Sequence, residues 1–350
     1  MAKKIGIIGI RGLPAKYGAF DTFVELLVTN PNVLNSKINF FVSSSKKNII
    51  KKNQYPNVKQ IFVPRLPDLL VLINYFLTIV IMLKNGVRVF LFFGYGAAIF
   101  FPFLKFINCK IVCNPDGIEW RRPNNFLKKN YFKFCELIFA KTKISKIYDS
   151  EVIRRYYMIK YKSRGETIYY PSKFENINFS FNRINKVKRF YLIGRLLEEN
   201  NVSLVVNTFK KLNRYKLFII GYKSEFFKKK ILPSIKDSKN IFYIGEIYNK
   251  EKLLRYLSFF DYYIHGHKVG GTNPTLIEAI NLKKKIFAYN CSFNKEILGK
   301  KKVYFRNDLE LINLIKYYDN YSYETHLYKK SFTQNYIGKE YLKILLNEFK

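Results

Sequence analysis

The sequence is poor in acidic residues, cysteine and histidine. Its 350 residues include 25 Asp and Glu against 62 Lys and Arg, which gives a formal net charge of +37. None of the four cysteines stands in a Cys-x-x-Cys pair and only three histidines exist, so neither a zinc site nor a disulfide framework is expected, and a reducing compartment fits best. The positive charge indicates an anionic partner, which is nucleic acid, an anionic membrane surface or a phosphate-bearing substrate.

The sequence also lacks an apolar run of the roughly 20 residues that cross a membrane. The longest run, Leu69–Leu83, is broken by Asn74 and Thr78, and it predicts a buried helix. A second run, Val87–Ile107, contains two glycines and a proline and predicts a strand, a turn and a helix. A membrane hairpin built from the two runs is the alternative. The apolar segment Ile5–Gly9 is too short for a signal peptide.

Short runs rich in β-branched and aromatic residues alternate with helical patterns along the whole chain. The predicted strands cover residues 4–10, 38–42, 60–63, 87–93, 110–114, 144–148, 167–170, 189–193, 216–220, 241–244, 262–265, 285–288 and 303–305. This alternation predicts an α/β fold with parallel sheets covered on both faces.

The alternation restarts near residue 188, which predicts two Rossmann-like domains facing a central cleft. We expect a first domain over residues 1–180, a second over 181–330, and a C-terminal helix over 331–350 that packs back toward the first domain. The Asn- and Lys-rich segment Phe174–Lys188 is the expected linker. Ligands of such sheets bind beyond the carboxyl ends of the strands, so motifs at those ends carry the most weight.

The first such motif is a glycine-containing loop after the first strand. Gly12 and Gly18 let the backbone approach a phosphate, and the amides of the helix expected from about Asp21 attract anions. The spacing matches neither Gly-x-Gly-x-x-Gly nor a P-loop, which excludes the usual nicotinamide and Walker-type sites. A turn that needs glycine only for its backbone angles is the alternative.

Two further motifs follow strands in the second half. Arg195 follows the strand 189–193 and is placed to clamp a diphosphate, although an ordinary surface arginine is the alternative. Gly270, Gly271, Thr272 and Asn273 lead into a helix that begins at Pro274. Their amides suit a phosphate, while the Glu278 carboxylate, one turn into the helix, suits sugar hydroxyls.

Two alternative roles concern residues of the same segment. Glu278 is alternatively a charge that stabilises the helix start. His265 and His267 share one face of a strand, but the chain has only one other histidine, so we expect no metal there.

The fourth motif, Asn114–Arg122, ends a strand of the first half and holds the only tryptophan, Trp120. Two acids, Asp116 and Glu119, stand beside Arg121 and Arg122. An Asp-Gly turn with a local salt bridge is the alternative to a binding role. No Asp-x-Asp occurs in the sequence, so the carboxylate-bound metal of many sugar-nucleotide enzymes is not expected.

Taken together, three of these segments resemble a known family. Residues 12–25, 116–122 and 265–279 are similar to the bacterial family 4 glycosyltransferases, and most similar to the rhamnosyltransferase-like branch that begins capsule, cell-wall or O-antigen repeat units. The resemblance runs from Lys4 to about Tyr341.

The resemblance implies a GT-B fold and a retaining reaction that uses no metal and no other cofactor. It implies that the second domain binds a nucleoside-diphosphate sugar, with dTDP-rhamnose favoured and a UDP- or GDP-hexose as the alternative. It also implies that the first domain binds a lipid-linked saccharide acceptor, carried on a polyprenyl diphosphate at the inner face of the plasma membrane.

The expected site residues, taken from the motifs and from the resemblance together, fall into three groups. The expected catalytic residues are Asp116, which orients or helps to deprotonate the acceptor hydroxyl, Arg195, which neutralises the leaving diphosphate, and Glu278. The expected donor-binding residues are Gly12, Gly18, Arg195, Gly270, Gly271, Thr272, Asn273 and Glu278. The expected acceptor-binding residues are Asp116, Glu119, Trp120 and Arg121.

The chain departs from the family pattern at four positions. Ala19 and Asp21 replace the glycine and glutamate that are usual in the branch. Asn200 and Gly270 replace a lysine and a glutamate of the wider family, as the branch itself does.

The net charge also fits a protein that is cytoplasmic and peripheral on the inner face of the membrane. Residues 126–140 mix aromatic residues with lysines and suit an interfacial helix, although an ordinary helix with a solvated basic face is the alternative. Arg154, Arg155, Lys160, Lys162 and Arg164 add charge to the same domain. No nucleic-acid recognition motif occurs, so nucleic acid is not an expected partner; a non-catalytic scaffold of a polysaccharide complex is a further alternative.

Overall fold

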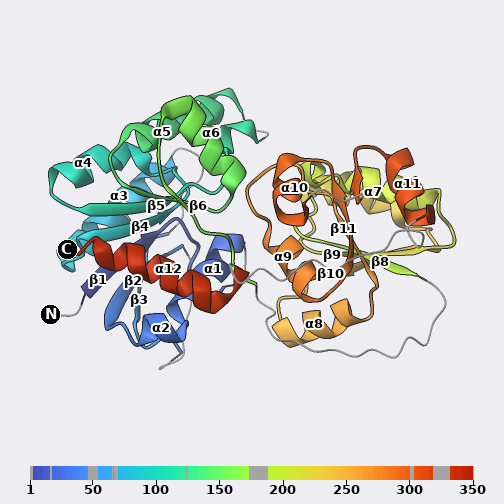
Figure 1. The fold of residues 1–350 in the computed structure, drawn as a ribbon, viewed down its shortest axis with the longest axis horizontal. Coiled ribbons are helices and arrows are strands. Elements are labelled where there is room, and N and C mark those ends of the chain that lie inside the picture. The colour runs from blue at the N-terminus through green and yellow to red at the C-terminus, as the bar shows by residue number, and fades with distance from the viewer. Residues whose placement is uncertain are drawn as a thin grey trace. The chain divides into compact units, whose positions relative to one another are not determined.

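The computed structural model describes residues 3–15, 18–45, 54–64, 66, 70–122, 125–172, 188–299, 303–317 and 332–349 (Figure 1). It divides the chain into two compact units, Met1–Lys173 with Lys330–Lys350, and Phe174–Lys329. The expected linker Phe174–Lys188 lies outside the described residues, apart from Lys188.

The first unit is built on a parallel sheet. Its described strands run in the order β3-β2-β1-β4-β5-β6-β7, and every pairing between them is parallel. The strands are β1 (Lys3–Ile8), β2 (Ile38–Ser44), β3 (Val58–Phe62), β4 (Val89–Phe93), β5 (Lys110–Asn114), β6 (Ser145–Tyr148) and β7 (Glu166–Thr167).

Helices cover both faces of this sheet because its strands are apolar on both sides (Figure 1). On one face, Ile5 and Ile7 pack in a core with residues of α1 (Ala19–Val28), α2 (Pro31–Leu34) and α12 (Gln334–Asn347). On the other face, a Cβ added at Gly6 would lie 2.8 Å from the sulfur of Met82 in α3 (Val71–Lys84). The remaining described helices of this unit are η2 (Ala98–Phe100), α4 (Phe101–Phe106), η3 (Glu119–Arg121), α5 (Phe126–Lys141) and α6 (Glu151–Tyr161).

The helix α3 corrects one expectation, because its apolar residues are not buried all round. Leu70, Ile73, Phe76 and Leu77 are exposed, whereas the polar Asn74 and Thr78 are buried. The reason is that the Asn74 side chain satisfies a neighbouring loop: it accepts a hydrogen bond from the Leu66 N–H at 2.8 Å and donates to the Pro64 carbonyl. None of the described helices is long and apolar enough to cross a bilayer.

The C-terminal helix α12 belongs to the first unit. One face of the helix is buried and carries Ile337, Tyr341, Ile344 and Leu345. The amide of Asn114, at the end of β5, donates to the Tyr341 hydroxyl at 2.9 Å. The helix therefore contacts the strand that leads into the Asp116 loop.

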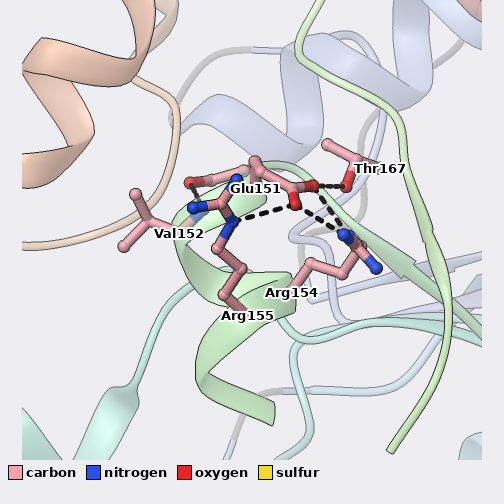
Figure 2. A network of polar contacts seen from close by, with 6 residues as sticks. Glu151, Val152, Arg154, Arg155 and Thr167 are labelled. Carbon is pink, nitrogen blue, oxygen red and sulfur yellow. Dashed lines mark hydrogen bonds and ion pairs between the residues drawn. The ribbon is translucent and has the colours of Figure 1, made fainter. Parts of the chain in front are cut away.

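An ion-pair network holds the start of α6 (Figure 2). Ser150 caps the helix, and Glu151 accepts hydrogen bonds from Arg154 at 2.6 and 2.7 Å, from Arg155 at 3.2 Å and from Thr167 at 2.9 Å. These bonds, led by those from Arg154, lower the pKa of Glu151 to about 2. The charges of Arg154 and Arg155 are thus partly neutralised within the unit.

The second unit is also built on a parallel sheet, whose described strands run in the order β10-β9-β8-β11-β12-β13. The strands are β8 (Arg189–Ile193), β9 (Lys216–Ile220), β10 (Ile241–Gly245), β11 (Tyr262–His265), β12 (Lys285–Tyr289) and β13 (Tyr304–Phe305). The helices are η4 (Glu198–Asn200), α7 (Val202–Lys210), η5 (Phe227–Ile231), η6 (Pro233–Ile235), α8 (Lys250–Ser258), α9 (Pro274–Asn281), α10 (Ser292–Leu298) and α11 (Asp308–Tyr317). The α/β fold with two Rossmann-like domains is confirmed, and every predicted strand overlaps an observed one. The bounds differ most at β7, which shares only Thr167 with the predicted strand 167–170.

Candidate functional site

In each unit, the sheet order reverses at the first strand. In the second unit β8 lies between β9 and β11, and in the first unit β1 lies between β2 and β4. Connections leave the two neighbouring strands toward opposite faces at such a point, which opens a crevice at their carboxyl ends. The motif at residues 194–195 follows β8, the motif at 265–278 follows β11, and the glycine loop at 9–18 follows β1.

Arg195 stands just beyond the carboxyl end of β8. Its backbone carbonyl accepts a hydrogen bond of 2.6 Å from the Asn200 side-chain amide, so Asn200 fixes the turn that carries the arginine. The Arg195 side chain is exposed, and no described residue forms an ion pair with it. The guanidinium is therefore open to an anionic ligand.

Two stacked imidazoles lie beside this turn. The rings of His265 and His267 are 4.7 Å apart between centroids with an interplanar angle of 17°. A Cβ added at Gly194 would lie 3.1 Å from the His267 ring, which places that ring against the end of β8. Burial, and then the nearby Arg195 charge, lowers the pKa of His267 to about 3, and burial likewise lowers the pKa of His265. Both rings are neutral at neutral pH.

The β11–α9 loop ends in a well-formed helix cap. The Asn273 side chain accepts from the Thr275 N–H at 3.0 Å and from the Thr275 hydroxyl at 2.8 Å. The Tyr263 hydroxyl lies 2.7 Å from the Thr275 oxygen and 2.8 Å from Nδ1 of His265, which ties the cap to the imidazoles. The amides at the start of α9 are thereby held in place.

Within this loop, the donor-binding candidates differ in exposure. Gly270 has a φ of 116° and no atom within 4 Å of an added Cβ, so its backbone faces open space. Gly271 and Asn273 are half-buried, whereas Thr272 and Glu278 are buried. The structure therefore brings Arg195 and the whole 270–278 motif to one edge of one sheet.

The glycine loop of the first unit is fixed by two acids of α1. The carboxylate of Asp21 accepts from the Arg11 N–H at 2.8 Å, and that of Glu25 accepts from the Ala15 N–H at 3.3 Å. Asp21 is buried, and through this bond it has a structural role in the loop.

The two glycines of this loop have different surroundings. A Cβ at Gly12 would lie 2.3 Å from the Ser44 hydroxyl, so Gly12 is needed for packing. Gly18, the residue before α1, has a φ of 95° and open space around it. Of the two, only Gly18 presents free backbone to a ligand.

Asp116 follows β5 with a φ of 65°, a left-handed conformation that is uncommon outside glycine and that clusters at functional sites. Its N–H donates to the Asn114 side chain at 3.0 Å, and its carboxylate is 3.3 Å from Nη2 of Arg122. Arg122 also pairs with Glu119 at 3.2 Å. The local salt bridge that the sequence allowed as an alternative is therefore present, and Arg122 joins both acids of the motif.

Trp120 and Arg121 belong to a different cluster from Asp116. The indole N–H of Trp120 donates to Glu136 of α5 at 2.8 Å, and the Arg121 guanidinium lies over the Trp120 and Tyr156 rings. The acceptor-binding candidates thus form two groups, one on Arg122 and one on Glu136.

Comparisons with known proteins follow the same division. Residues 2–172 match the family model "Domain of unknown function (DUF1972)", and residues 173–316 match "Glycosyl transferases group 1". The glycosyltransferase model thus matches most of the second unit, which supports a glycosyltransferase. No curated protein matches the sequence.

Solved structures of similar fold cover nearly the whole chain of this glycosyltransferase. A glycosyltransferase from Rickettsia africae ESF-5 is 16% identical with a TM-score of 0.71, covering 99% of this chain and 98% of its own. Sucrose-phosphate synthase from Thermosynechococcus elongatus is 12% identical with a TM-score of 0.74, covering 99% and 95%. The lipopolysaccharide outer core galactosyltransferase WaaB is 12% identical with a TM-score of 0.64, covering 99% of both chains. At these identities the likeness shows the GT-B fold.

Sequence reasoning missed several residues that shape the sites of this glycosyltransferase. His267 was considered only as a metal ligand, although it packs at the end of β8 beside Arg195. Glu136 and Tyr341 lie 16 and 227 residues from their partners Trp120 and Asn114, and no local pattern in the sequence links them.

Proposed function

We propose that this glycosyltransferase is a retaining enzyme of bacterial surface polysaccharide synthesis. It moves a sugar, L-rhamnose from dTDP-rhamnose, to a saccharide carried on a polyprenyl diphosphate. The observation that carries the proposal is the edge of the second sheet where an exposed Arg195 and the capped 270–273 loop lie beyond neighbouring strands. Cationic and amide donors at one such edge suit the diphosphate of an activated sugar.

The donor binds mainly on the second unit. The loop amides at Gly270, Gly271, Thr272 and Asn273 hold phosphate, Arg195 pairs with the diphosphate, and Glu278 binds sugar or ribose hydroxyls. The imidazoles of His265 and His267 are neutral, so the positive charge beside them comes from Arg195. Gly18 of the first unit, which has open space beside its backbone, stays a separate donor-binding candidate.

In the reaction, the bond between the anomeric carbon and the diphosphate oxygen breaks. A new bond forms on the same face of the sugar to an acceptor hydroxyl oxygen, and the leaving phosphate takes the hydroxyl proton. Negative charge grows on the leaving oxygen, so fixed donors aimed at it lower the barrier, and each donor typically raises the rate by a factor of about 10² to 10³. Arg195 supplies the charge in this scheme without a metal.

Asp116 acts on the acceptor. The left-handed backbone at φ 65° and the ion pair to Arg122 hold its carboxylate in a defined orientation. It orients the acceptor hydroxyl so that the proton passes to the leaving phosphate, while Glu119 shares the same arginine.

The acceptor reaches the enzyme from a membrane, and the first unit carries a surface that suits one. Exposed apolar residues lie on α3, η2, α4 and α5, including Phe76, Phe103, Phe106 and Phe126. Tyr75 of α3 and Phe132 of α5 both lie within 4 Å of a Cβ added at Gly96, so these elements adjoin. Lysines on α4 and α5 provide attraction to anionic lipid, at about 1 kcal/mol each near the surface. We call this surface, on α3, η2, α4 and α5, the apolar face.

The donor is tested by thermal unfolding in the presence of a panel of sugar nucleotides. A ligand at 100 times its dissociation constant stabilises the folded state by about 2.7 kcal/mol. We expect dTDP-rhamnose to raise the melting temperature most, and transfer to a lipid-linked saccharide to follow with retained anomeric configuration. Larger stabilisation by a UDP- or GDP-hexose would reassign the donor, and no stabilisation by any member would contradict the proposal.

A further inference from the structure

The single tryptophan of the chain is surrounded by cations. The Arg121 guanidinium, the Lys133 ammonium and the Lys160 ammonium lie 5.3, 5.4 and 5.3 Å from the Trp120 ring. They come from η3, α5 and α6 of the first unit. Each distance is within the range of a cation–π interaction. We call Trp120 with these three cations the Trp120 cluster.

A buried carboxylate holds the cluster together. Glu136 is fully buried and accepts hydrogen bonds from Nε1 of Trp120 at 2.8 Å, Tyr156 at 2.7 Å, Tyr161 at 2.6 Å and Nζ of Lys160 at 3.0 Å. Four donors on one carboxylate satisfy its charge and fix the orientation of the indole.

The cluster nevertheless carries excess positive charge. Glu136 neutralises one of the three cations, and in the part of the chain that the structure describes neither Arg121 nor Lys133 has an acidic partner. Like charges gathered on one ring repel each other, so a bound anion relieves a cost that the free protein bears. Both head groups are exposed and reachable by a ligand.

We propose that the Trp120 cluster binds a diphosphate group, and that in the reaction proposed above this group is the one that links the acceptor saccharide to its lipid. Arg121 presents a planar fork to the phosphate oxygens, and Lys133 and Lys160 add point charges beside it. Trp120 and Tyr156 offer ring surface to the adjoining sugar or isoprenoid. The identity of the ligand rests on the proposed function. That the ligand is an anion follows from the cations of the cluster alone.

Because Trp120 is the only tryptophan, its fluorescence reports on this site directly. The protein is titrated with inorganic pyrophosphate, farnesyl diphosphate, farnesol, and sodium sulfate at matched ionic strength. We expect saturable changes with both diphosphates, and about tenfold weaker affinity in Lys133→Ala and in Arg121→Ala. Lys339→Ala, an exposed lysine of α12 in the same unit, is the matched control and should bind as the wild type does.

Each other outcome counts against the inference. A response to farnesol and farnesyl diphosphate but not to pyrophosphate would show that the cluster binds the apolar chain and not the diphosphate. Equal responses to sulfate and to the diphosphates would show an unspecific ionic effect. Unchanged affinity in both variants would remove the cations from the site. A response to pyrophosphate but not to farnesyl diphosphate would overturn the lipid-linked source. Stabilisation by dTDP-rhamnose, measured separately, reports on the donor site and distinguishes failure here from failure of the proposed function.

Discussion

Single side chains at the strand ends determine what each unit can bind. Asp116 adopts a left-handed backbone that aspartate tolerates better than most residues, and Asn114 and Arg122 hold it there. Arg195 is presented by a turn that Asn200 fixes. In both places a short polar side chain supports the backbone of the residue that we propose binds a ligand.

For Asp116, the account predicts a separation of binding from turnover. Asp116→Asn keeps the size and the tolerance of left-handed backbone but loses the charge, so we expect kcat to fall by about 10² to 10⁴ and donor affinity to stay unchanged. Steady-state kinetics and donor titration check this. If donor affinity collapses as well, the acceptor role of Asp116 is wrong.

The stacked histidines predict a pH dependence of stability. Their pKa values are lowered in the folded state, to about 3 for His267, so between there and the ordinary value near 6.5 the unfolded state binds protons that the folded state does not. The contribution of the two histidines to the free energy of unfolding is complete above about pH 6.5. Below that pH it falls by about 1.4 kcal/mol per pH unit for each ring. Thermal unfolding from pH 8 to 5 should show a shallower profile in His267→Gln; an identical profile would contradict the burial argument.

At the scale of elements, the first unit has helices with unusual faces. In α3 the polar Asn74 points inward to a loop, and Phe76 and Leu77 point outward. In α4, Phe106 is 85% exposed. Exposed apolar faces on neighbouring helices, next to lysines, are typical of surfaces that bind a membrane or another protein.

The membrane role of the apolar face is tested by sedimentation with vesicles. We expect binding to anionic but not to neutral vesicles, and weaker binding at high salt. In the double variant Phe103→Ser/Phe106→Ser, vesicle affinity should fall about tenfold or more, because two rings that insert into the bilayer interface are removed. Phe259→Ser, an exposed phenylalanine of the second unit, is the control. Equal binding to neutral vesicles, or no effect of the double variant, would count against this role.

The elements show how far sequence reasoning reaches. The strands were predictable because they are short runs rich in β-branched and aromatic residues, and central strands such as β4 and β8 are buried on both faces. Which side of α3 is buried could not be predicted. Asn74 forms hydrogen bonds with residues 64 and 66, and such a contact leaves no periodic pattern in the sequence. For the same reason Arg195 and the 270–278 motif could be found from the sequence, whereas the contact between Trp120 and Glu136 could not.

At the scale of the whole molecule, two sheets of the same order place their candidate residues at equivalent positions. Gly18 follows β1 and Arg195 follows β8, and each of these strands is the one where its sheet order reverses. In the proposed function, the net charge of +37 attracts two kinds of anion, the phosphates of the ligands and the lipid surface. The central claim is that Arg195 and the 270–273 loop receive the diphosphate of the donor.

Calorimetric titration with a nucleoside diphosphate tests this claim most directly. Arg195→Ala should weaken affinity by about tenfold to a hundredfold, since a hydrogen bond to a charged group contributes about 1.5 to 3 kcal/mol. The control is Arg214→Ala, an exposed arginine just before β9, at the amino-terminal edge of the same sheet, and it should bind as the wild type does. Wild-type affinity in Arg195→Ala would contradict the account.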